Sequence, residues 1–480
     1  MVMINLKLKK CYSIFCLALL IVFVVSCSTT KIEIEEADVY ETINYAWWQE
    51  FKDDNLIYLI NLALDNNKDI KVAKLKLTEY ASFVDASFGG ELPVISTTLG
   101  GYNTNRNTKF DIGNPMIPPI TIADKRGVVF PISISYEIDY LGKNRDKTKS
   151  IKAQFEAYEY QVQSMYLTLI SNVSTLYFNI MKINKLIELQ EVIISIKDDI
   201  INNLNQKYEK GLISNIEINN YKQEILNIKT NIENLNITKN NLLTQLLVLI
   251  GKDASNIESI NITDLDEMID VEVQKEVSSD VIFSRPDILA YEKQLQKAEI
   301  DVAVARKEFF PTIQLSAGVL FSDLGAGGLF DAKNTIYNIL GGLTFDIFTG
   351  GRKKANLNIM NSRYEQMFEN YKQISLQATK EIQDSLDAIK YNKNIMLNNN
   401  EKYDFERQNY NKYTEMYKND LITEVDLKQL EQKLVAIEVE QVNAKIQEYI
   451  DYISLYKATA GKINIVNNNI NNEINNNINK

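Results

Sequence analysis

Residues 207–217 read KYEKGLISNIE, and residues 416–426 read MYKNDLITEVD, so one polar turn with helix-like flanks occurs twice. The stretch YEIDYLGKNR at 136–145 likewise recurs as LTFDIFTGGR at 343–352. Two copies of one large unit in the same order indicate an internal duplication. The unit is far longer than a solenoid repeat. We therefore expect two structural repeats arranged around an axis.

Helix-breaking residues are almost absent on both sides of these turns. None of the seven prolines lies between 137 and 285 or after 311, and Gly211 is the only glycine between 143 and 250. The apolar residues of this stretch keep a spacing of three and four, as in Leu186, Leu189, Ile193, Ile196, Ile200 and Leu204. Such spacing is typical of coiled coils. The sequence predicts helical hairpins at 142–251 and 350–460, and the first arm, of about 67 residues, would be roughly 100 Å long.

Each turn carries residues suited to ending one helix and starting the next. Gly211 suits a helix C-cap, and Ser214 or Asn215 suits the following N-cap. In the second turn Asn419 or Asp420 must take the role of the glycine, and Thr423 is the expected N-cap. The arms of both hairpins should therefore reverse direction at these positions.

Four short segments of alternating apolar and polar residues precede the hairpins. They lie at about 94–104, 128–139, 312–322 and 336–347, two in each repeat. About ten residues of such alternation is the length of a transmembrane β-strand, although a soluble sheet with one buried face shows the same pattern. Four strands cannot close a barrel, and open edges are not tolerated in hydrocarbon. A membrane sheet would therefore need several copies of the chain.

The predicted fold class is mainly α with a small β part. We expect a first repeat at 27–251, an equatorial linker at 252–283 and a second repeat at 284–461. The Asn-rich end at 462–480 is of low complexity, and we expect it to be disordered.

The N-terminus predicts an exported, lipid-anchored protein. Lysines precede an apolar run at 11–25, as in a signal peptide of residues 1–26. The next residues, Val-Val-Ser-Cys27, resemble a bacterial lipobox, which implies that Cys27 carries lipid. Ser28 after the cysteine implies sorting to the outer membrane. An ordinary signal peptide, or an uncleaved anchor, is the alternative.

Composition excludes several classes of function. The chain has no histidine, and its three cysteines lie at or before residue 27. After cleavage of the signal peptide only Cys27 would remain, and it would carry lipid, so we expect no thiol catalysis, disulfide framework or cysteine metal site. The absence of histidine removes the commonest general base and metal ligand. The net charge is −11 and no basic cluster is visible, which argues against nucleic-acid binding. We expect neither enzymatic activity nor a cofactor.

Charged residues mark both predicted strand-to-helix junctions. Asp139 precedes Arg145 in the first repeat, and Asp346 precedes Arg352 in the second. We interpret these four as structural residues rather than as a substrate site. The aromatic residues of 47–51 are interpreted as helix-packing residues rather than as a membrane belt.

With the repeat, the lipobox, the strands and the hairpins in place, the chain resembles the TolC-type outer membrane efflux proteins, in particular their lipoprotein branch. The resemblance covers about 27–461, and its motifs are WWQEF at 47–51, RPDI at 285–288, FFP at 309–311, FDIFTGGR at 345–352 and the two hairpin turns. It implies a homotrimer with a twelve-stranded β-barrel in the outer membrane and an α-barrel in the periplasm. It also implies an adaptor protein and an inner-membrane transporter as partners, and a passive conduit whose cargo the transporter selects.

The resemblance also implies a gate at the periplasmic tips. Tyr417 matches a constricting tyrosine of the family, and Asp426 matches its first aspartate. The chain departs from the family at Gln429, Ile422 and Asp420, where a second aspartate, a basic residue and a glycine are usual. The implied gate therefore consists of Tyr417, Asp426, Glu424, Asp420 and, in the first hairpin, Glu217. The alternative is that these charges are merely solvated.

Two other kinds of envelope lipoprotein are the alternatives, a periplasmic adaptor with a long helical hairpin and a structural lipoprotein that forms a coiled coil. A periplasmic adaptor would carry one hairpin with flanking domains, whereas this chain predicts two hairpins, each preceded by paired strands. A coiled-coil structural lipoprotein would lack membrane-type strands.

Overall fold

The computed structural model describes residues 47–103, 108–111, 119–122, 126–253, 255, 260–268, 279–322 and 335–461. The predicted signal peptide, Cys27 and the Asn-rich end lie outside these residues. The described chain forms two compact units. The first contains Lys76–Ala157 and Lys293–Phe368, and the second contains the described parts of 36–75, 158–292 and 369–480.

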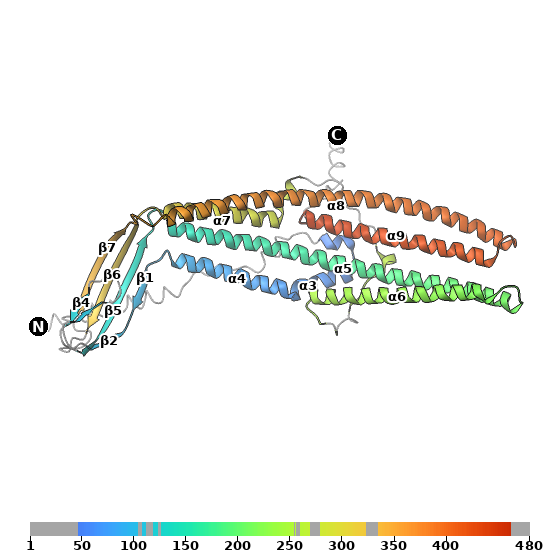
Figure 1. Ribbon diagram of the computed structural model, residues 1–480, viewed down its shortest axis with the longest axis horizontal. Coiled ribbons are helices and arrows are strands. Elements are labelled where there is room, and N and C mark those ends of the chain that lie inside the picture. Colours follow the sequence, from blue (N-terminus) through green and yellow to red (C-terminus); the bar gives the residue numbers. More distant parts are fainter. Residues whose placement is uncertain are drawn as a thin grey trace, which may run out of the picture. The chain divides into compact units, whose positions relative to one another are not determined.

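Four long helices form two hairpins (Figure 1), as the distribution of proline and glycine predicts. They are α5 (Lys143–Glu209), α6 (Asn215–Leu249), α8 (Arg352–Lys418) and α9 (Glu424–Ala458). The shorter helices are η1 (Trp47–Phe51), α3 (Asp54–Asn66), α4 (Lys68–Gly89), η3 (Leu265–Glu267), η4 (Ser279–Ser284) and α7 (Pro286–Lys307). The first arm of each hairpin has 67 residues, in agreement with the expected length. None of the described helices combines the length and the apolar character needed to cross a bilayer.

The first unit contains an antiparallel sheet with the order β1-β5-β6-β7, in which β2 also pairs with β5. Its strands are β1 (Val94–Thr97), β2 (Gly100–Asn103), β5 (Arg126–Ile138), β6 (Thr312–Ser322) and β7 (Thr335–Thr344). The strands overlap the four predicted segments, although β7 ends before the expected residue 347. The loop between the first two segments contains the short antiparallel pair β3 (Thr108–Phe110) and β4 (Ile120–Ile122).

The first predicted strand, 94–104, is divided into β1 and β2 by a proline on the neighbouring strand. The register is the same on both sides of the gap, because Thr97 lies opposite Ile132 and Gly100 lies opposite Val129. The gap lies opposite Pro131, which has no N–H to donate to the ladder. The Pro131 carbonyl still accepts from the backbone N–H of Thr98 at 3.4 Å. The proline thus weakens the pairing locally without changing the path of the strand.

The strand register gives the sheet one apolar face and one polar face. The apolar face carries Ile132, Ile134, Tyr136, Ile138, Ile313, Leu315, Ala317, Val319, Tyr337, Ile339 and Leu343. The other face is mainly polar, with Ser133, Ser135, Glu137, Gln314, Ser316, Gly318 and Asn338, and it also carries Leu320, Ile336 and Leu340. In a single chain Tyr337 is 81% exposed and Ile339 is 77% exposed. A soluble sheet would cover such an apolar face, so the pattern favours strands between lipid and water.

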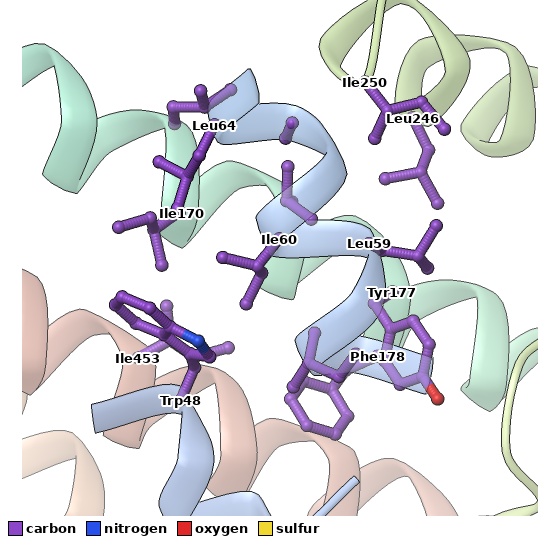
Figure 2. Packing of buried hydrophobic residues seen from close by; sticks show 14 of the residues in the cluster. Trp48, Leu59, Ile60, Leu64, Ile170, Tyr177, Phe178, Leu246, Ile250 and Ile453 are labelled. Atoms are coloured by element: carbon purple, nitrogen blue, oxygen red, sulfur yellow. The ribbon is translucent and has the colours of Figure 1, made fainter. Parts of the chain in front are cut away.

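The main core lies in the second unit, where α3 packs against the long helices (Figure 2). The ring centroids of Phe51 and Phe178 lie 5.0 Å apart, and those of Phe178 and Tyr449 lie 4.8 Å apart. Trp47 stacks on Tyr456 with a centroid distance of 5.0 Å. The aromatic residues of 47–51 are therefore packing residues, as the sequence analysis favours.

Asp53 connects three segments of this core through its buried carboxylate. It caps α3 by accepting the backbone N–H groups of Asn55 and Leu56, at 2.9 and 3.2 Å. It also accepts hydrogen bonds from the hydroxyl of Tyr177 on α5 at 2.6 Å and from the hydroxyl of Thr263 at 2.9 Å. Burial, with a contribution from this carboxylate, raises the pKa of Tyr177. Asp53 therefore fixes η1 and α3 against α5 and the 260–268 segment.

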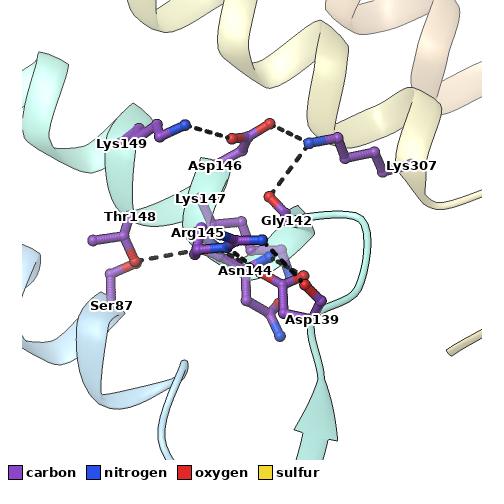
Figure 3. Close-up of polar contacts among 10 residues, drawn as sticks. All are labelled: Ser87, Asp139, Gly142, Asn144, Arg145, Asp146, Lys147, Thr148, Lys149 and Lys307. Carbon is purple, nitrogen blue, oxygen red and sulfur yellow. Dashed lines mark hydrogen bonds and ion pairs between the residues drawn. The ribbon is translucent and has the colours of Figure 1, made fainter. Parts of the chain in front are cut away.

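The junction between β5 and α5 is closed by Asp139 and Asp146 (Figure 3). The Asp139 carboxylate accepts the backbone N–H groups of Asn144 and Arg145, at 3.1 and 3.0 Å. Burial opposes the charge on Asp139, but these hydrogen bonds outweigh it and lower its pKa. Lys307, at the end of α7, donates to Asp146 and to the Gly142 carbonyl. These contacts support the structural interpretation of Asp139.

We predict that Asp53→Ala lowers the free energy of unfolding by about 3 kcal/mol, because it removes a helix cap and two buried hydrogen bonds. Thermal melting of the detergent-solubilised protein, followed by circular dichroism, measures the change. Asp54→Ala, at the exposed neighbouring position, is the matched control and should change stability by only a few tenths of a kcal/mol. Equal melting of the two variants would contradict the assigned role of Asp53.

Candidate functional site at the hairpin tips

The first hairpin tip is a compact turn that ends α5 and begins α6. Gly211 has a φ of +68°, in the left-handed region, and its N–H donates to the Tyr208 carbonyl at 2.8 Å. The N–H of Leu212 donates to the Lys207 carbonyl at 2.9 Å. This pattern satisfies the last carbonyls of a helix. Ser214 then caps α6, since its hydroxyl accepts the N–H of Ile216.

The second tip repeats this geometry without a glycine. Asp420 has a φ of +59°, and its N–H donates to the Tyr417 carbonyl at 3.0 Å. The N–H of Leu421 donates to the Met416 carbonyl at 3.0 Å, so the hydrogen-bond pattern matches that of the first tip. Asp420, and not Asn419, occupies the position of the glycine. Asn419 instead donates from its side chain to the Glu415 carbonyl.

Thr423 and Asp426 form a capping box at the start of α9. The Thr423 hydroxyl accepts the N–H of Asp426, and the Asp426 carboxylate accepts the N–H of Thr423 at 2.9 Å. The hydrogen bonds from Thr423, first from its side chain and then from its backbone, lower the pKa of Asp426. A lowered pKa means that this cap contributes fully above the ordinary carboxyl pKa and is lost as the pH falls through the folded-state value. Asp426 therefore has a structural role independent of any gate.

Polar side chains connect α9 to α5 along the tip. Asn203 donates to Glu424 at 2.7 Å, Lys428 donates to Asp199 at 2.9 Å, and Lys197 donates to Gln432 at 3.1 Å. The three α9 partners, Glu424, Lys428 and Gln432, are spaced by four residues, which places them on one helix face. The Asp199 carboxylate raises the pKa of Lys428 to about 12. This contact row could not be predicted from the sequence, because the spacing of four indicates a shared face but not the helix that it meets.

Lys197 is the buried member of this row, with a side chain that is 5% exposed. Its ammonium also donates to Glu224 of α6 and lies 5.5 Å from the centre of the Tyr221 ring. The Tyr221 hydroxyl in turn accepts a hydrogen bond from the side-chain amide of Gln429 at 3.0 Å. Gln429, which departs from the family's usual aspartate, therefore joins the second hairpin to the first.

The residues proposed for the gate all lie at the tips, but only two of them have side-chain partners there. Asp426 contacts Thr423, and Glu424 contacts Asn203. Glu217 and Asp420 are exposed, and Tyr417 is 37% exposed. Within the described part of the chain, these three side chains enter no ion pair. The tips thus present unneutralised carboxylates to solvent on a scaffold fixed by caps.

The chemistry available at the tips is electrostatic. In the portion of the chain that the structure describes, no group of three or more His, Cys, Asp or Glu side chains is placed to hold a metal ion. Exposed carboxylates brought close together by symmetry would repel one another and favour cations.

Comparison with known proteins points to one family. The sequence profile described as "Outer membrane efflux protein" matches residues 59–252 and 277–461. The chain is 25% identical to the cation efflux system protein CusC of Escherichia coli, over 89% of this chain and 91% of the relative. It is 23% identical to the probable outer membrane lipoprotein SilC of Salmonella typhimurium, over 86% and 87% of the two chains. The crystal structure of the Campylobacter jejuni CmeC outer membrane channel matches with a TM-score of 0.76, at 23% identity over 90% of each chain.

The left-handed conformation of Asp420 gives a prediction for the second tip. Asp420→Gly should stabilise the turn by about 1 kcal/mol, because glycine adopts a positive φ without a steric cost. Gly211→Asp is the reciprocal change in the first tip and should destabilise it by a similar amount. Amide hydrogen exchange of the residues that follow each turn reports the change. Slower exchange in Gly211→Asp, or faster exchange in Asp420→Gly, would refute the shared geometry.

Proposed function

The chain belongs to the outer membrane efflux protein family, and from this membership and the sheet geometry we propose that three copies form one continuous conduit. As a member of this family the protein is an outer membrane efflux channel that extends into the periplasm. The proposed trimer joins four strands from each copy into a twelve-stranded barrel and continues it with the helical hairpins. Substrates pass through it from a periplasmic adaptor and an inner-membrane transporter to the exterior.

The main support for this proposal comes from the two edge strands of the sheet. In the order β1-β5-β6-β7, the strands β1 and β7 are the outer ones, and three antiparallel steps separate them. They therefore run in opposite directions, so β7 of one copy meets β1 of the next as an antiparallel neighbour. Such head-to-tail pairing repeats around a ring and leaves no open edge when the ring closes. The apolar face then contacts lipid and the polar face lines the pore.

The hairpins support a conduit rather than either alternative. Each of the two hairpins is preceded by strands of the sheet, whereas an adaptor lipoprotein would carry one hairpin and a coiled-coil lipoprotein no such sheet. The family consists of channel proteins, and we propose no reaction for this chain. Its task is to provide a passage and a gate, and the transporter supplies the free energy.

We also propose that Cys27 carries the lipid anchor, in line with its lipobox-like sequence and the lipoprotein relative. At the periplasmic end, symmetry repeats the carboxylates of Asp426, Glu424, Asp420 and Glu217 around the axis, with Tyr417 beside them. This acidic ring is proposed to restrict passage and to bind cations. The names of the relatives include cation and solvent efflux systems, so the inner-membrane partner is proposed to select the cargo.

The trimeric conduit is tested by extracting the full-length lipoprotein in detergent. Native mass spectrometry should give a mass of three chains, and planar-bilayer recordings should show discrete single-channel currents. A monomer without channel activity would reject the proposal and favour one of the two alternatives. Metabolic labelling with palmitate, compared between wild type and Cys27→Ser, tests the anchor separately.

If Asp426 belongs to the gate, the effect of its charge on the channel can be separated from its role in capping α9. Asp426→Asn removes the charge but retains hydrogen-bonding groups, and it should weaken block by divalent cations several-fold. Thr423→Ala keeps the charge but weakens the cap, at a cost of about 1 kcal/mol to the helix start. Divalent block should persist in Thr423→Ala. If both variants lose the block equally, Asp426 acts only by holding the helix start.

A further inference from the structure

The polar face of the sheet gathers charge at its helix-proximal end. Glu137, Gln314 and Gly342 lie in one row across β5, β6 and β7. The Glu137 carboxylate accepts the ammonium of Lys143, from the start of α5, at 2.7 Å. Beyond the end of β7, Asp346 pairs with Lys353 of α8 at 3.1 Å. Two ion pairs therefore flank this end of the polar face.

A cavity of about 610 Å³ opens between these ion pairs. Its charged lining residues are Lys143, Glu308, Asp346, Arg352 and Lys353, and the lining also includes Thr312 and Thr344. Thr312 and Thr344 pair across β6 and β7, and each lies two residues from Gln314 or Gly342. Because side chains alternate along a strand, these threonines are on the same face as that row. The cavity therefore belongs to the polar face of the sheet.

Among the described residues, Arg352 is the lining cation without a carboxylate partner, and Glu308 is the lining anion without a cationic partner. Lys143 and Lys353 have the carboxylate partners given above, and Glu308 accepts the side chain of Asn356 at 3.2 Å. The Arg352 side chain is exposed and has no ion pair among the described residues. A guanidinium presents a planar set of donors that matches a carboxylate.

The cavity also has an apolar part. Phe310 is 53% exposed and Ile359 is 49% exposed, although both line its wall. A free cation beside uncovered apolar surface suits a small molecule with an anionic group and an apolar body.

We propose that this cavity is a transient binding site for amphipathic organic anions, with Arg352 holding the carboxylate and Phe310 and Ile359 contacting the apolar body. The proposal rests on the proposed function, because only closure of the barrel turns this face toward the pore. In the trimer the site occurs three times, where the strands meet the helices. The site gives the conduit a local preference for anionic cargo. It lies far along the chain from the acidic hairpin tips.

The first repeat provides a matched control. Arg145 occupies the position in YEIDYLGKNR that Arg352 occupies in LTFDIFTGGR. Arg145 lies 3.6 Å from the Asp139 carboxylate, and it does not line the cavity. The two arginines therefore have corresponding positions but different surroundings. The structural interpretation holds for Arg145, whereas the proposal replaces it for Arg352, so only Arg352 should affect ligand binding.

Single-channel recording with the full-length lipoprotein tests the site, with 2-naphthoate as the anionic probe, 2-naphthamide as the neutral probe and naphthylmethylammonium as the cationic probe. Naphthoate should interrupt the current at concentrations where naphthamide has no effect. Arg352→Gln should weaken the naphthoate block about tenfold, because it removes a charge-assisted hydrogen bond. Arg145→Gln should leave the block unchanged.

A second variant moves the block in the opposite direction. Glu137→Gln leaves Lys143 without its carboxylate partner and should strengthen the naphthoate block, which a general loss of folding cannot do. Equal block in wild type and Arg352→Gln, or no change in Glu137→Gln, would overturn the proposal. Absence of any channel current in wild type would instead reject the conduit itself, so the two failures are distinguishable.

Discussion

The backbone groups along the outer edges of β1 and β7 are the constraint on which the rest of the architecture depends. In water such edges invite aggregation, and in hydrocarbon each unpaired N–H or C=O costs several kcal/mol. The apolar face around Ile339 requires hydrocarbon, so other strands must complete the ladder. Because the chain supplies an even number of main strands, its two edges are complementary and identical copies can close the ring. Each repeat of the internal duplication contains two strand segments and one helical hairpin. This explains why helices and strands occur together in each repeat.

The two repeats have diverged at the junction where sheet becomes helix. In the first, Asp139 accepts the N–H groups that begin α5, and Arg145 folds back toward it. In the second, Asp346 pairs with Lys353, which leaves Arg352 without that partner. Duplicated sequence therefore conserves the position of an arginine without conserving its environment. One copy of the junction can keep a structural role while the other becomes free to contact a ligand.

Local sequence is sufficient to predict the two long hairpins and the four main strand segments, and it is insufficient wherever two distant segments meet. Helices and turns follow from proline, glycine and cap residues, and the strands follow from alternation, since each signal lies within one segment. The gap opposite Pro131 depends on the partner strand, and the left-handed φ of Asp420 was one of two options that the turn left open. The row joining Glu424, Lys428 and Gln432 to α5 depends on how two hairpins pack. The Asp53–Tyr177 contact likewise joins segments far apart in the chain, so no periodicity reports it.

The four long helices differ in how well one copy covers them near the tips. The buried cluster in this region contains residues of α5, α6 and α9, among them Ile200, Ile218 and Val435, and none of α8. Leu397 and Phe405 of α8 are 54% and 64% exposed. Exposed apolar surface of this kind marks a contact with another protein surface. In the proposed ring, a neighbouring copy would lie beside the part of α8 near the tips. The closure that pairs the strand edges would then also cover the apolar residues that a single chain leaves exposed there.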